Sequence, residues 1–174
     1  MPTLKPFRDY DEKDVINLFA INTGTPSKGT LVKIHTGWKS SDELEMIGHA
    51  GASFTNVVSQ RYGVTAKVSV AGAGDSPLGM LLFDVKEVDE NGEALKFNPR
   101  KAAEMEAVLP GQAVPLVTKG IFLYSGVVGS PAAGDSLYCG ADGVLTATVA
   151  SNVKVGIALG AKDGNNDVLV RLHI

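Results

Sequence analysis

The chain has 174 residues, a formal net charge of −3, 20 glycines, and only 6% aromatic and 20% charged residues. This length suits one domain or two small ones and allows a sizeable core. The composition argues against a nucleic-acid binder, which needs a basic stripe, and against a membrane helix or disulfide framework, since there is no long apolar run and Cys139 is the single cysteine.

Glycine together with β-branched residues favours short strands and tight turns, so we expect a mainly β fold. The chain opens without the apolar stretch of a secretory signal, which predicts a soluble protein made inside a cell. We expect two small β-barrel or sandwich units with one short linking helix and an N-terminal arm.

Residues 1–24 form the polar, mixed-charge N-terminal arm, and two interpretations of it stay open. In the first, Asp11 caps a short helix whose apolar residues are Val15, Leu18 and Phe19. In the second, the arm is extended and docks its aromatic side chains on a neighbouring surface. These side chains are Phe7, Tyr10 and Phe19.

Residues 25–97 are predicted to form an N-terminal β-domain. Apolar and polar residues alternate at 64–70, a second strand is expected at 30–35, and 78–88 has the pattern of a long, largely buried strand. Residues 71–77 form a loop. Asp89-Glu-Asn-Gly92 predicts a hairpin turn, because Asn-Gly tolerates positive φ.

Residues 98–110 are predicted to form the linking helix. Asn98 is a good N-cap, Pro99 suits the first helical position, and Pro110-Gly111 ends the helix. Its apolar face contains Ala102, Met105 and either Val108 or Leu109.

Residues 111–174 are predicted to form a C-terminal β-domain. Its strands are expected at 113–117, 121–124, 136–139, 144–148, 153–159 and 168–172. The order of residues in 155–171 parallels that in 78–97, which indicates two similar β-units; chance similarity of glycine-punctuated hairpins is the alternative.

One motif suggests an enzyme. Gly134-Asp-Ser-Leu137 has the signature of a serine esterase family, in which Ser136 would be the nucleophile. A nucleophilic serine needs a positioned base, yet no Asp-x-x-His follows and His173 is the only downstream histidine. The start of a strand after a Gly-Asp turn is therefore the favoured interpretation.

Other candidate sites are also weak. The 72–79 loop lacks the Gly-Lys-Ser/Thr ending of a phosphate-binding loop, and the 163–167 turn lacks the glutamate of a calcium loop. Three histidines, His35, His49 and His173, have no zinc-site spacing. We expect no catalytic residue, no metal and no cofactor. Cys139 is expected in the core, and Trp38 either anchors a partner or packs over its own hairpin.

The C-terminal third carries a family resemblance. Gly134-Asp-Ser-Leu-Tyr138 is followed by Asp142-Gly-Val-Leu-Thr146, then by Val155-Gly-Ile-Ala-Leu159 and Val168-Leu-Val-Arg-Leu172. This order resembles the capsid decoration, or cement, proteins of tailed bacteriophages over about residues 111–174.

The resemblance implies a non-enzymatic virion protein, made in the host cytoplasm, that stabilises the mature head from outside by bridging major capsid protein subunits. It implies a homo-oligomer, trimer or dimer, with no nucleic-acid or membrane partner. We expect contacts through the arm, the hairpin tips and Trp38. Another phage structural part, such as a head fibre base or tail protein, is the alternative; a serine esterase using Ser136 is a weaker one.

Overall fold

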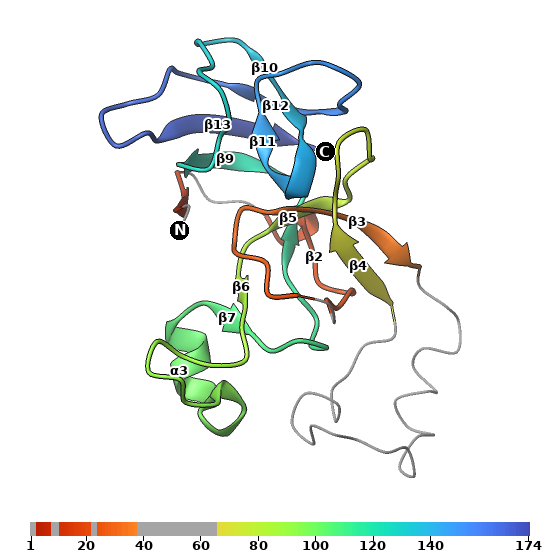
Figure 1. Ribbon diagram of the computed structural model, residues 1–174, viewed down its shortest axis with the longest axis vertical. Coiled ribbons are helices and arrows are strands. Elements are labelled where there is room, and N and C mark those ends of the chain that lie inside the picture. The colour runs from red at the N-terminus through yellow and green to blue at the C-terminus, as the bar shows by residue number, and fades with distance from the viewer. Residues whose placement is uncertain (1–2, 8–10, 22–23, 38–65) are drawn as a thin grey trace.

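The computed structural model describes residues 3–7, 11–21, 24–37 and 66–174. In these residues the protein is mainly β with one short α-helix, as the sequence predicts. Two antiparallel sheets and a small helical lobe follow one another along the long axis of the molecule (Figure 1). We call the sheets the upper sheet and the central sheet.

The upper sheet has six strands, and neighbours pair antiparallel throughout. Their spatial order is β1 (Leu4–Pro6), β9 (Lys119–Tyr124), β13 (Val168–His173), β12 (Lys154–Ala158), β10 (Ser136–Cys139) and β11 (Leu145–Thr146). Hairpins join β10 to β11, through the 3-10 turn Ala141–Gly143, and β12 to β13.

The central sheet has five strands, also antiparallel. Their order is β2 (Val15–Ile16), β8 (Leu116–Val117), β5 (Gly79–Leu81), β3 (Leu31–Thr36) and β4 (Lys67–Val70). Adjacent residues of one strand enter different cores: Leu31 packs with the upper sheet, while Val32 packs on the opposite side. Burial of both faces explains why β5 and β8 are continuously apolar, whereas β3 and β4 also carry polar residues.

The main core lies between the two sheets. It contains buried residues of the upper sheet such as Phe122, Leu137 and Val170 and residues of the central sheet such as Met80 and Val117. The joint burial of these side chains holds the two sheets together, at about 25 cal/mol per Å² of apolar surface removed from water.

The third unit, which we call the α3 lobe, comprises residues 84–109. The parallel pair β6 (Asp84–Val85) and β7 (Ala107–Val108) connects it to the central sheet, and the 3-10 turn Leu95–Phe97 and α3 (Pro99–Glu104) form its outer part (Figure 1). Leu95, Ala107 and Leu109 make its small core.

The linking helix begins as predicted and ends earlier. The side chain of Asn98 accepts the N–H of Lys101 at 3.2 Å, and Pro99 occupies the first turn. The helix ends at Glu104 because Glu106 adopts a left-handed φ of 50°, so Val108 lies in β7 instead of on the helix.

Of the two interpretations of the arm, the helix at Val15, Leu18 and Phe19 is wrong. Residues Glu12–Asp14 form a single 3-10 turn, after which Val15–Ile16 forms β2 and pairs with β8. The β-branched pair packs in a sheet, and Phe19 is buried against the central sheet. Earlier in the arm, β1 completes the edge of the upper sheet.

Two predicted strands, at 78–88 and at 113–117, differ from the expectation in their extent or in the sheet to which they belong. The strand expected at 78–88 is divided into β5 and β6, because the chain bends at Leu82 and Phe83 and passes to the α3 lobe. Strand β8 belongs to the central sheet although its residues fall within 111–174. The proposed repeat differs as well: 155–171 contains the β12–β13 hairpin, whereas Leu95–Phe97 is a 3-10 turn.

Candidate functional site

The esterase motif lies at a turn followed by a strand. The carboxylate of Asp135 accepts the N–H of Ala132 at 2.7 Å, and Ser136 begins β10. His173 lies on β13, two strands away across β12. Two strand spacings amount to about 10 Å, so the sheet does not bring a histidine base within reach of Ser136.

The other predicted loops are closed by their own side chains. Asp163 accepts the N–H groups of Asn165 and Asp167 at 2.8 and 2.9 Å, so its carboxylate closes a tight turn. Asp75 accepts the N–H of Gly72 and pairs with Lys33, each at 2.7 Å. In the described part of the chain, no group of three His, Cys, Asp or Glu residues could hold a metal ion.

The cysteine lies in the core as predicted. Cys139 is fully buried on β10, and burial raises the pKa of its thiol. A thiol with a raised pKa has little thiolate at neutral pH, which makes it a poor nucleophile.

Of the four predicted contact residues, the structure describes Phe7 and Phe19, and their environments differ. Phe7 is 59% exposed at the end of β1, whereas Phe19 is only 8% exposed and belongs to the core. Tyr10 and Trp38, like His49, lie outside the described residues. His35 is exposed on β3.

The outward side of the upper sheet has a distinctive composition. Along β9 and β13, buried residues alternate with Lys119, Ile121, Leu123, Leu169, Arg171 and His173. Lys5 on β1, with Ile157 and Lys154 on β12, extends this surface. We call these nine residues the outer face: it is basic and aliphatic and contains no carboxylate.

A depression lies on the β12–β13 part of the outer face. Its volume is about 470 Å³, and Lys154, Gly156, Ile157, Arg171 and His173 line it. Ile157 is the cross-strand neighbour of Arg171, which in turn pairs with Ile121. Among the residues that the structure describes, none forms an ion pair with Lys119, Lys154 or Arg171. Unpaired cations beside partly exposed aliphatic side chains make this surface a candidate for interaction.

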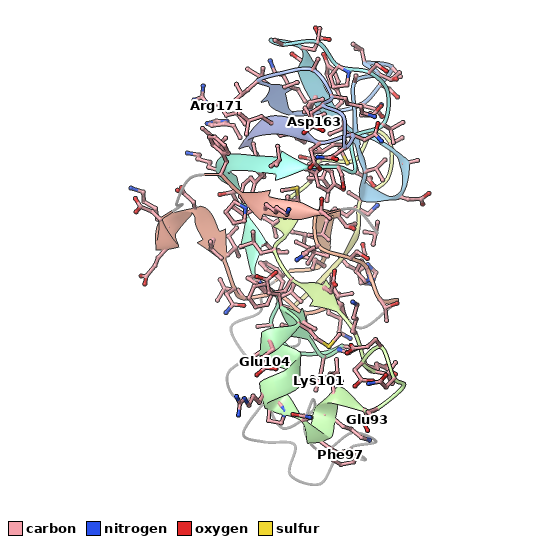
Figure 2. All side chains as sticks on the ribbon, turned by 90° about the vertical axis from the view of Figure 1, so that its left-hand side faces the viewer. Glu93, Phe97, Lys101, Glu104, Asp163 and Arg171 are labelled. Carbon is pink, nitrogen blue, oxygen red and sulfur yellow. The ribbon has the colours of Figure 1, made fainter. Side chains whose placement is uncertain are left out.

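The α3 lobe is net acidic, with seven carboxylates and four cations at residues 84–109, and one of these cations, Lys96, lies beside Phe97. Phe97 is 78% exposed and Val88 48% exposed, and both Glu87 and Glu93 are exposed without an ion-pair partner in the described part of the chain. Figure 2 places Glu93 and Phe97 at one end of the molecule and Arg171 at the other.

Sequence reasoning missed the outer face. Every second residue of these strands lies on the outward side of the sheet, and these residues, such as Lys119, Ile121 and Leu123, are basic or aliphatic instead of uniformly polar. This mixture is the pattern by which the sequence could have indicated the surface. Only the register between strands shows that these positions form one surface.

Comparison with known proteins agrees with the resemblance in the sequence. A family model described as phage cement protein matches residues 102–173, which include every strand of the upper sheet except β1. The comparison with curated proteins finds no match, and neither does that with solved structures. No helix among the described residues is long and apolar enough to cross a membrane. Residues 102–173 thus match the phage cement protein family, and this match supports a structural protein associated with the phage capsid.

Proposed function

We propose that this protein binds the outer surface of the mature phage head and stabilises it by bridging major capsid protein subunits. The observation that carries the proposal is the coincidence of the family match with the upper sheet. A protein that binds only the expanded shell stabilises that shell by the free energy of binding. Many copies on one lattice, assembled as a homo-oligomer, would add avidity.

The first candidate for a shell contact is Phe7. Its backbone N–H donates to the carbonyl oxygen of Ile121 at 2.9 Å, which holds the residue at the edge of the upper sheet while its ring stays exposed. Aromatic side chains dominate interface energetics. Tyr10 and Trp38 remain proposed contacts, and the buried Phe19 would anchor the segment that carries Phe7 and Tyr10.

The test is a binding assay with purified protein, using expanded DNA-filled heads and unexpanded proheads. We expect cosedimentation with the expanded heads only, and cryo-electron microscopy should place the protein on the exterior. Phe7→Ser should weaken binding, whereas Val149→Ser, at a similarly exposed apolar residue in a loop, should not. Equal binding to proheads, absence from the exterior, or only a few copies per virion would overturn the proposal; the last would favour a tail or head-fibre part.

A further inference from the structure

The two ends of the molecule carry complementary chemistry. The outer face presents Lys119, Lys154 and Arg171 without carboxylate partners in the described residues. The α3 lobe presents Glu87 and Glu93 without cationic partners there. Surfaces of opposite charge attract and orient each other when two molecules meet.

The apolar groups match as well. Phe97 is the most exposed large hydrophobic residue among those described, and its ring lies 4.9 Å from the ammonium of Lys96. The depression on the outer face is lined by Ile157 and by the cations Lys154 and Arg171. At about 470 Å³ it has the size of pockets that bury small molecules, so it has room for an aromatic ring. Arginine and lysine also bind favourably over aromatic faces.

The geometry excludes an internal contact. Arg171 and Phe97 lie at opposite ends of the same molecule, with the central sheet between them (Figures 1 and 2). The α3 lobe therefore cannot reach the outer face of its own chain, but it can reach that of another copy.

We propose that two copies of this protein associate head to tail, with the α3 lobe of one copy docked on the outer face of the next. Such an interface joins two different surfaces, so each copy keeps one free lobe and one free face. Repetition closes a ring if the rotation between copies allows it and gives an open chain if it does not. The association needs no capsid and is tested in solution, so its failure and the failure of head binding are distinguishable.

The experiment uses two full-length variants and measures mass by analytical ultracentrifugation at low and high salt. The face variant combines Lys154→Glu with Arg171→Glu, and the lobe variant combines Glu87→Lys with Glu93→Lys. We expect concentration-dependent association of the wild type that weakens with salt, because screening reduces charge attraction. Each variant alone should raise the dissociation constant at least about tenfold.

The decisive sample is an equimolar mixture of the two variants. The face variant retains a native lobe and the lobe variant retains a native face, so the mixture should associate although neither variant does so alone. Lys13→Glu and Glu12→Lys are matched controls, since they reverse exposed charges outside both surfaces and should associate like the wild type. Circular dichroism and thermal unfolding establish that all variants are folded.

Three results would overturn the proposal. The first is a wild type that stays monomeric at its highest soluble concentration. The second is association that the face and lobe variants leave unchanged, which would assign the interface to another surface. The third is a mixture of folded variants that remains monomeric, which would show that the outer face and the lobe have different partners.

Discussion

Gly143 lies directly against the backbone of Leu31: a Cβ on Gly143 would be 2.5 Å from the carbonyl oxygen of Leu31. This contact places the turn between β10 and β11 of the upper sheet on strand β3 of the central sheet. Gly143 also has a φ of 68°, in the region that glycine adopts without strain. Two requirements for glycine therefore coincide where the sheets meet.

Gly143→Ala should destabilise the protein more than an alanine at another left-handed glycine. Gly134 has a φ of 92° and open space around it, so Gly134→Ala should cost only the backbone strain of about 1–2 kcal/mol. Gly143→Ala adds a clash with backbone and should lose roughly 1–3 kcal/mol more. Denaturant unfolding of both variants measures the difference, and equal losses would show that the sheets separate easily at this point.

Tyr124 predicts a loss of stability at alkaline pH. Its ring lies between Gly29 and Gly126, and burial raises the pKa of its hydroxyl to about 12. In the unfolded chain the pKa is about 10, so the stabilisation is fully present below pH 10 and is lost as pH rises toward 12. The loss amounts to roughly 2–3 kcal/mol.

Tyr124→Phe should remove this part of the alkaline loss, as measured by urea unfolding between pH 8 and about 12. Tyr138→Phe, at a partly exposed tyrosine of the upper sheet, is the control and should lose stability like the wild type. Identical alkaline profiles for the wild type and Tyr124→Phe would contradict the assignment.

Asp89 predicts sensitivity to acid in the α3 lobe. Its buried carboxylate pairs with Lys101 and accepts the N–H groups of Asn91 and Glu93 at 2.7 and 2.8 Å. The hydrogen bond from Lys101 and, after it, those backbone N–H groups hold the pKa of Asp89 below its ordinary value, against the opposing effect of burial. The stabilisation is therefore present above about pH 4 and is lost as pH falls through the lower value of the folded state.

Asp89→Asn should lower stability at pH 7 and flatten its decline between pH 5 and about 2, as measured by urea unfolding. Asp163→Asn is a matched control, because Asp163 also accepts two backbone N–H groups in a turn but has no lysine partner among the described residues. If Asp89→Asn leaves the pH dependence of the unfolding free energy unchanged while Asp163→Asn alters it, the acid sensitivity belongs to the β12–β13 hairpin and not to Asp89.

Local patterns in the sequence predicted local structure well. The strand at β4 follows from period-two alternation, and those at β3, β10, β12 and β13 follow from short apolar runs bounded by turn residues. The Asn98 cap follows from a side chain that accepts a nearby backbone N–H. The break between β5 and β6 could not be predicted, because Leu82 and Phe83 continue the apolar run and only their packing bends the chain.

The pairing of strands that are distant in the chain could not be predicted from the sequence. Nothing local indicates that Leu4–Pro6 pairs with β9, or that β8 lies between β2 and β5. The outer face depends on the same pairings, since Arg171 becomes the neighbour of Ile157 and Ile121 only through strand register. The family resemblance succeeded because it used the order of turn and strand residues, which needs no register.

The position of β1 has a consequence for how the chain folds. Leu4 can pair with Tyr124 of β9 only after Tyr124 has been synthesised, more than one hundred residues later. Pairings so distant in sequence slow the folding of β proteins, because a long loop must close before any contact forms. A fragment starting at residue 102 would also lack β1 and would leave β8 without β2 and β5. We therefore expect that the region that matches the family does not fold by itself and that the native state forms only after synthesis of the whole chain.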